Sequence, residues 1–172
     1  MFMTQENKAQ KERLDKIFRR VKILYGDVPP QMKFLGSIEA DYLEDFLKTV
    51  MRVVKHPNIN PDLFGFIRLN IAFREDYAYC KMWNTKFLLA KEYTQEQLDR
   101  AIADIADVPF DDKHKALAIH AIKAIYESKK VTQNNFEQLY KMGWSQKDVF
   151  DVIEHAGMIL RNGRILTAYM VK

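Results

Sequence analysis

The sequence predicts an all-α protein, and three observations carry that prediction. Apolar side chains recur at the i, i+3, i+4 spacing of amphipathic helices along most of the 172 residues. Segments rich in proline, glycine and asparagine, namely YGDVPP, HPNINPD and DVPFDD, interrupt that spacing. The alternation of apolar and polar residues that marks a half-buried strand is absent. We therefore expect an all-α chain of about seven to nine helices, with one domain and an appended element.

The first helix, expected within residues 1–25, is basic and amphipathic. Its apolar side chains share one face: Leu14, Ile17, Phe18, Val21 and Leu24. Residues 1–22 hold seven basic and three acidic side chains, whereas the other 150 residues hold 20 of each. The main domain, residues 26–172, therefore has no basic excess with which to bind nucleic acid. We expect the first helix to pack on that domain or on a neighbouring subunit; docking to a membrane surface or an acidic partner is the alternative.

The middle of the chain is predicted to contain a buried helix followed by the helix that carries the single cysteine. Ser37 is a suitable N-cap for a helix that precedes HPNINPD. Asn60 followed by Pro61 starts the next helix, DLFGFIRLNIAFR, which is apolar on nearly all sides and so belongs in the centre of the fold. Asp76 is the candidate cap for the helix that carries Cys80.

Two segments of the chain, 51 residues apart, suggest an internal repeat. YTQEQLDRAI, from Tyr93, and WSQKDVFDVI, from Trp144, each have an aromatic residue, a hydroxyl N-cap, a glutamine and similarly spaced apolar residues. Thr94 opens a capping box, and Ser145 and Thr132 are N-caps of further helices. One interpretation is two similarly capped helices. The other is a repeated helix-turn-helix unit that forms the two halves of one core.

Composition limits the location and the class of the protein. No apolar run is long enough to span a bilayer, and the polar N-terminus lacks the apolar core of a signal peptide. A single cysteine cannot form an intrachain disulfide. We therefore expect a cytoplasmic protein that binds neither membrane nor nucleic acid.

The histidines do not indicate a metal site. None of the four lies at i, i+3 or i+4 from another, so no metal and no cofactor are expected. His120 is expected in the core or at an interface, and His155 is expected to face a pocket or another subunit. His56 and His114 lie in or beside predicted turns. Arg68 is the one basic residue on the buried helix, with its charged end either held inside or extended to the surface.

Several of these features together resemble the alkyl hydroperoxidase D-like (AhpD-like) superfamily, also called carboxymuconolactone decarboxylase-like. The resemblance spans roughly residues 24–170 and rests on LYGDVPP, the apolar helix, the cysteine helix, GWSQKDVFDVIEHA and RNGRI. It implies an all-α AhpD-like helical bundle with a repeated helix-turn-helix core. It also implies a homo-oligomer, as a dimer, trimer or hexamer.

The peroxidase branch of that superfamily carries C-x-x-C-x-x-x-H on the cysteine helix. The second cysteine is the one usually assigned the attack on the hydroperoxide, the other resolves the sulfenic acid, and the histidine belongs to a proton relay. In YAYCKMWN the resemblance puts Tyr77 at the first cysteine, Cys80 at the second and Asn84 at the histidine. The branch also uses an upstream glutamate, but no acidic residue lies between Asp62 and Glu75.

Cys80 thus keeps the nucleophile's position without the nucleophile's partners. A place in the first turn of a helix favours its thiolate, whereas the nearby Glu75 and Asp76 oppose it. Asn84 cannot exchange a proton near neutral pH, and Tyr77 cannot form a disulfide. A two-cysteine peroxidase cycle within one chain is therefore excluded.

Three hypotheses for function remain. The leading one is a divergent AhpD-like protein of unknown role, with its two-cysteine peroxidase activity lost and Cys80 buried and inert. The first alternative is an antioxidant oxidoreductase, a one-cysteine thiol-dependent peroxidase that uses Cys80 and an external thiol reductant. The second alternative is a non-catalytic oligomer for small-ligand binding or scaffolding, with a pocket lined by Tyr77, Cys80 and Asn84.

Overall fold

The computed structural model of the chain describes residues 8–169, which divide into two units. Those residues contain nine α-helices, two short 3-10 turns and no strand, so the all-α prediction is confirmed. Of the described residues, 8–54 form unit 1 and 55–169 form unit 2. The part of the predicted first helix that falls in residues 1–7, and the side chain of Leu24, lie outside the described residues.

Unit 1 is built around the apolar face of its first helix. Its helices are α1 (Lys8–Tyr25), α2 (Pro30–Ile38) and α3 (Ala40–Val54). Leu14, Ile17 and Val21 of α1 are buried, as the amphipathic spacing predicts. They form one core cluster with Met32 of α2 and Leu43 of α3. The first helix is therefore attached to α2 and α3 through the same stripe that the sequence singles out.

The start of α3 differs from the prediction. Ser37 does not cap it: Ser37 lies in the last turn of α2, where its hydroxyl donates to the carbonyl of Phe34 (2.7 Å). α3 begins at Ala40, after the extended residue Glu39. The short segment that precedes Ser37 forms its own helix because Pro30 stands at its first position, where the missing N–H costs no hydrogen bond.

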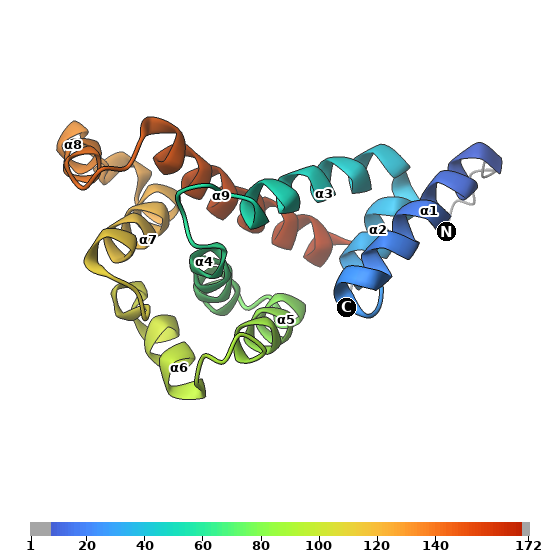
Figure 1. Cartoon of the computed structure of the whole chain (residues 1–172), viewed down its shortest axis with the longest axis horizontal. Coiled ribbons are helices and arrows are strands. Elements are labelled where there is room, and N and C mark those ends of the chain that lie inside the picture. The colour runs from blue at the N-terminus through green and yellow to red at the C-terminus, as the bar shows by residue number, and fades with distance from the viewer. Residues whose placement is uncertain (1–7, 170–172) are drawn as a thin grey trace. The chain divides into compact units, whose positions relative to one another are not determined.

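Unit 2 surrounds one buried helix. Its helices are α4 (Pro61–Arg74), α5 (Ala78–Leu89), α6 (Gln95–Ala103), α7 (Asp112–Tyr126), α8 (Gln133–Lys141) and α9 (Gln146–Ala168). The 3-10 turns are Ile105–Asp107 and Ser128–Lys130. α4 packs against α5, α6, α7 and α9, and Figure 1 shows it nearly end-on among them. Nine of its fourteen residues are buried, so the predicted central helix is confirmed.

Two hydrogen bonds repeat at the offset of 51 residues. The hydroxyl of Tyr93 donates to the carboxylate of Asp62 (3.3 Å), in the first turn of α4. The indole Nε1 of Trp144 donates to the carbonyl of Lys113 (3.0 Å), in the first turn of α7. Both acceptors precede their aromatic residue by 31 positions. α4 and α7 are therefore each tied at their start to the aromatic residue that precedes a later capped helix.

The turns before those capped helices repeat as well. Glu92 and Gly143, which lie 51 residues apart, both have positive φ, 67° and 88°. The predicted N-caps Thr94 and Ser145 each close a capping box, at the start of α6 and of α9. Residues 60–103, with α4 to α6, and residues 111–154, with α7, α8 and the first part of α9, are thus equivalent. We call them the first half and the second half of unit 2.

The predicted cap of the cysteine helix is wrong. Asp76 has φ 57° and pairs with Lys81 instead of capping α5. Tyr77 occupies the N-cap position and makes no side-chain hydrogen bond there. The reason is the tight reversal after α4, which ends at Arg74: a left-handed residue is needed to bring the N–H of Tyr77 back to the carbonyl of Ala72 (2.9 Å).

Candidate functional site

Cys80, the only cysteine of the chain, lies in the first turn of α5, as predicted. Its side chain is partly buried. Burial raises the pKa of the thiol, and the positive charge of Arg68 opposes that shift without cancelling it. The balance keeps the thiol protonated near neutral pH, and the helix start does not by itself make an activated nucleophile.

Asn84 connects Cys80 to the buried helix. Its Nδ2 donates to the carbonyl of Cys80 (2.8 Å), one turn earlier in α5. Its Oδ1 accepts a hydrogen bond from Nε of Arg68 on α4 (2.8 Å). The guanidinium carbon of Arg68 also lies 5.4 Å from the centre of the Phe87 ring. The amide of Asn84 therefore orients the backbone of the cysteine helix relative to α4.

His155 brings α9 into the same cluster. Its Nε2 lies 3.3 Å from Nη1 of Arg68. Because a guanidinium only donates, Nε2 accepts and the ring proton resides on Nδ1. Burial, with the nearby charge of Arg68, lowers the pKa of His155 well below its ordinary value. His155 is therefore neutral at physiological pH and serves Arg68 as an acceptor.

Tyr77 belongs to the packing of the core. Its ring lies so close to Gly163 of α9 that a Cβ on that glycine would stand 2.0 Å from the ring. Its hydroxyl donates to the carbonyl of Leu160 (3.3 Å). Burial, with the negative charge of Glu75, raises the pKa of the phenol. Tyr77 is thus held against α9 as a neutral phenol.

The structure brings together three of the residues that the sequence singled out and adds a contact it did not suggest. Cys80 and Asn84 meet as i and i+4 in α5, and Arg68 joins them from α4. His155, which was expected to face a pocket or another subunit, contacts Arg68. The catalytic role assigned to Cys80, with Tyr77 and Asn84, stays a prediction.

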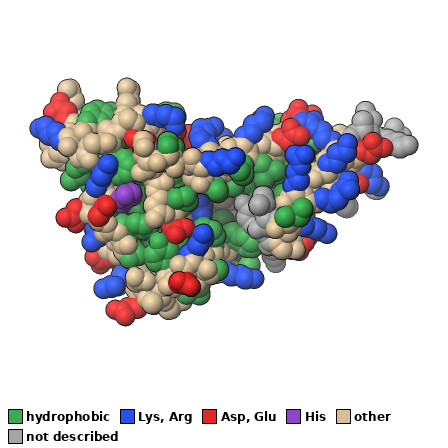
Figure 2. All heavy atoms as spheres, viewed as in Figure 1, with side chains coloured by type: hydrophobic (Ala, Val, Ile, Leu, Met, Phe, Trp, Pro, Cys, Tyr) green, Lys and Arg blue, Asp and Glu red, His purple; other side chains and the backbone are tan. Residues whose placement is uncertain are grey.

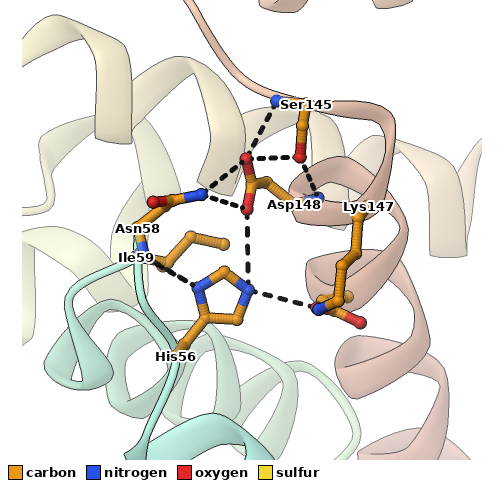
Figure 3. A network of polar contacts seen from close by, with 7 residues as sticks. His56, Asn58, Ile59, Ser145, Lys147 and Asp148 are labelled. Atoms are coloured by element: carbon orange, nitrogen blue, oxygen red, sulfur yellow. Dashed lines mark hydrogen bonds and ion pairs between the residues drawn. The ribbon is translucent and has the colours of Figure 1, made fainter.

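A second polar network surrounds His56, which precedes α4 (Figure 3). Its Nε2 lies 3.1 Å from Oδ2 of Asp151 and 3.7 Å from Oδ1 of Asp148, both on α9. Its Nδ1 accepts the backbone N–H of Ile59 (3.1 Å) and that of Asn58 (3.3 Å). Since a backbone N–H only donates, Nδ1 is unprotonated and Nε2 carries the proton. His56 thus bridges its own segment and α9.

Asp148 joins this network to the capping box of α9. Its Oδ2 accepts from the N–H (2.9 Å) and the hydroxyl (2.7 Å) of Ser145, and its Oδ1 accepts from Nδ2 of Asn58 (3.1 Å). Burial opposes its ionisation, but the bonds from Ser145 and Asn58 and the nearby His56 outweigh it and lower the pKa of Asp148. The start of α9 is therefore tied to the segment before α4.

The sequence did not reveal the network around His56. Its members lie as far as 95 residues apart, and the only signal was the capping box of Ser145. The other histidines are in the environments expected for them: His120 is buried against Phe136, and His114 lies in the first turn of α7. Within the described residues, no group of three or more His, Cys, Asp or Glu side chains is arranged to hold a metal ion.

Unit 1 has an open cavity of about 510 Å³ beside α1. Its lining includes Phe18, Arg19 and Lys22 of α1, Asp27 of the following turn and Lys33 of α2. Lys33 lies 3.8 Å from Asp27. Figure 2 shows basic and acidic side chains intermixed on the visible surface over these helices. The cavity is therefore of mixed charge with a slight basic excess.

A membrane-spanning helix is not found: across residues 8–169 no helix combines the length and the apolar character that crossing a bilayer requires. No protein-family model matches the sequence, and no curated protein sequence matches it.

Two solved structures are similar to this chain. One is an uncharacterized peroxidase-related protein from Silicibacter sp. TM1040, with 14% identity and a TM-score of 0.82, aligned over 99% of this chain and 95% of that one. The other is an uncharacterized peroxidase-related protein from Ralstonia eutropha JMP134 described as an alkylhydroperoxidase AhpD core, with 17% identity and a TM-score of 0.78, aligned over 97% and 88%. The predicted AhpD-like fold is therefore confirmed.

Proposed function

We propose that this chain, which has the AhpD-like fold, is a divergent protein of that kind whose two-cysteine peroxidase activity has been lost. The observation that best supports the proposal is the place of Tyr77. It stands where the resemblance puts the first cysteine, and its ring and hydroxyl are used in packing against Gly163 and Leu160. Cys80 is the only cysteine, so a sulfenic acid formed there has no resolving thiol in its own chain.

The surroundings of Cys80 support the same proposal. Both ends of the Asn84 amide are used, one on the Cys80 carbonyl and the other on Arg68, so this side chain orients backbone and does not accept the thiol proton. His155 is a poor base because its pKa is lowered by burial and by Arg68. Burial also raises the pKa of the thiol itself. The groups around Cys80 favour a protonated, unreactive sulfur.

The test is the consumption of hydrogen peroxide and of an organic hydroperoxide, with dithiothreitol as the reductant. We expect equal background rates for the wild type and for Cys80→Ser. Turnover that disappears in Cys80→Ser would overturn the proposal. Alkylation by iodoacetamide gives a second measurement: its pH midpoint should lie above the free-thiol value of about 8.5. A midpoint near neutral pH would contradict the electrostatic argument.

The second candidate, a one-cysteine thiol-dependent peroxidase, is favoured by Arg68, whose positive charge stabilises the Cys80 thiolate. In that cycle the thiolate sulfur attacks a peroxide oxygen, the O–O bond breaks, and the alkoxide takes a proton and leaves as an alcohol. Two external thiols then reduce the sulfenic acid, forming a disulfide and releasing water. Under this candidate, Arg68→Met raises the alkylation midpoint and removes Cys80-dependent turnover.

The third candidate is a non-catalytic protein that binds a small ligand or acts as a scaffold through α1. The cavity beside Arg19 and Lys22 supports it. Deleting residues 1–22 would remove buried side chains from unit 1, so Arg19→Gln with Lys22→Gln is the sharper test. An unchanged circular dichroism spectrum with loss of a bound acidic partner would support docking. Unchanged partner binding would exclude it.

The proposal includes a cytoplasmic homo-oligomer, as a dimer, trimer or hexamer. Large apolar side chains that are exposed on unit 2 support assembly, among them Met82 (61% exposed), Ile119 (41%) and Phe150 (62%). Light scattering during size-exclusion chromatography should give a multiple of the 20.3 kDa chain mass. The mass of a single chain would contradict this part of the proposal.

A further inference from the structure

We propose that His56 is a proton-triggered latch for the segment that joins the two units of the chain. The division between the units falls after Val54, so His56 is the second residue of unit 2. It is buried and has hydrogen-bonding partners on both edges of its ring. One edge holds residues 58 and 59, and the other edge holds α9. The latch does not depend on Cys80 or on the function proposed above.

The closed state requires a neutral imidazole with its proton on Nε2. Nδ1 offers its lone pair to two backbone N–H groups, those of Ile59 (3.1 Å) and Asn58 (3.3 Å). The side chain of Ile59 is buried, so these bonds also keep an apolar residue in the core before α4 begins. Nε2–H donates to Asp151 (3.1 Å). Only this tautomer lets Nδ1 accept hydrogen bonds while Nε2 donates one.

Protonation breaks hydrogen bonds on one edge of the ring only. The incoming proton has one available lone pair, that of Nδ1, and there it converts the acceptor into a donor. Nδ1–H then faces two other donors, the N–H groups of Ile59 and Asn58, so both hydrogen bonds are lost. On the opposite edge, the imidazolium is attracted more strongly by Asp151 and Asp148. The segment is released while the ring stays on α9.

The charged groups that face the ring favour this asymmetry. From α9 they are Asp148, Asp151 and the ammonium of Lys147, which pairs with Asp151. Two carboxylates against one ammonium leave one negative charge for the imidazolium to neutralise. From α4 the ring meets Phe64, whose centroid lies 5.9 Å away. His155, on another side of Phe64, is neutral because its pKa is lowered by burial.

The release is reversible because a second contact remains. Nδ2 of Asn58 donates to Oδ1 of Asp148 (3.1 Å), and this bond does not use the His56 ring. Asp148 stays ionised at mildly acidic pH, since its hydrogen bonds lower its pKa. The segment therefore stays near α9 while its backbone amides are open to solvent.

The test uses the full chain and residue-resolved amide exchange, measured at intervals from about pH 8 down to about pH 5. Nitrogen spectra of the imidazole follow the protonation of His56. We expect the protection factors of the Ile59 and Asn58 amides to fall about tenfold as His56 protonates, the effect of one lost hydrogen bond. The amide of Val152, inside α9, should keep its protection. Protection of Ile59 that is unchanged across the His56 titration, or a parallel loss at Val152, would overturn the latch.

Two variants distinguish the hydrogen bonds of the Nδ1 edge from those of the Nε2 edge. In His56→Asn the amide oxygen takes the place of Nδ1, so Ile59 should stay protected at every pH. In His56→Gln the amide nitrogen takes the place of Nε2, so Ile59 should be unprotected at every pH. His114→Asn, which alters a histidine in the first turn of α7, is the matched control and should leave the Ile59 profile unchanged. A pH-dependent Ile59 profile that persists in both His56 variants would exclude the latch.

Discussion

The two halves of unit 2 share a framework and differ in the polar groups that the framework carries. Both open with a side-chain cap, Asn60 at the start of α4 and Asp111 at the start of α7. Both place an aromatic residue 31 positions after the residue to which it donates, and both turn through a positive φ. The two caps satisfy backbone N–H groups that the start of a helix leaves open. The backbone framework is therefore the same in both halves, although other side chains differ.

Two polar positions differ between the halves. Arg68, which lies beside Cys80 in the first half, corresponds to the exposed Ile119 in the second. Gln97, the residue that closes the first capping box, corresponds to Asp148, which is buried, ionised and bonded to Asn58. The cysteine cluster (Cys80, Asn84, Arg68 and His155) therefore has no equivalent of Arg68 in the second half, and the His56 network requires Asp148 of the second half. Equivalent backbones thus carry different side-chain chemistry.

The largest expected effect is at the third residue of the two capping boxes. Asp148→Ala removes a buried carboxylate, leaves Ser145 and Asn58 without their acceptor and takes away one of the two carboxylates beside His56, so we expect a loss of about 3 kcal/mol. Gln97→Ala removes only the cap and should cost about 0.5–1 kcal/mol. Urea unfolding followed by circular dichroism measures both. Equal losses would mean that the network adds nothing to the capping box.

The contact between α5 and α9 gives the next effect. Gly163→Ala places a methyl group on the ring of Tyr77, so we expect a loss of about 1–3 kcal/mol from overpacking. Gly157→Ala is the matched control in the same helix, where the nearest atom, on Ile125, lies 3.5 Å from the added carbon. That control should be neutral or stabilising by up to about 1 kcal/mol. Thermal unfolding measures the stability of both variants. If Gly163→Ala is as stable as the wild type, Tyr77 is free to move.

The cysteine cluster should make the protein sensitive to acid. The pKa of His155 is lowered in the folded state, so below its unfolded value of about 6.5 the unfolded chain binds the extra proton. That stabilisation is complete above about pH 6.5, and each lower pH unit then costs up to about 1.4 kcal/mol until the folded pKa is reached. His155→Gln should flatten the dependence of urea-unfolding free energy on pH. Identical slopes for the wild type and His155→Gln would show that His155 is not held neutral.

The smallest effect concerns the matched turns. Glu92 adopts a left-handed φ of 67°, so Glu92→Gly should stabilise the fold by about 0.5 kcal/mol, the relief of strain less the entropy cost of glycine. Gly143→Ala, at φ 88°, should cost about 1 kcal/mol. Chemical denaturation of the two single variants measures both changes in unfolding free energy. Destabilisation by Glu92→Gly would mean that the turns are not equivalent.

The features that the sequence predicted correctly are local ones. Asn60, Thr94 and Ser145 were identified as N-caps because a cap bonds an amide two or three residues away. The two wrong caps, Ser37 and Asp76, also have suitable side chains. They fail because the start of α2 at Pro30 and the reversal after α4 decide where the next helix begins.

Two of the four residues of the cysteine cluster could be placed together from the sequence. Cys80 and Asn84 are one helical turn apart, so their proximity follows from spacing alone. Arg68 and His155 join them from α4 and α9, 87 residues apart, and no spacing rule connects such positions. The same holds for His56 and Asp151, which lie 95 residues apart.

The sequence by itself determined the all-α class, the buried α4, the capping boxes and the absence of a second cysteine, because each follows from residue types within a few turns of one another. Only the tertiary structure decided that Cys80 is shielded, that His155 is neutral and that His56 has a single tautomer. Those properties depend on desolvation and on charges brought together by folding, and both are set by what packs around a group and not by its neighbours in the chain.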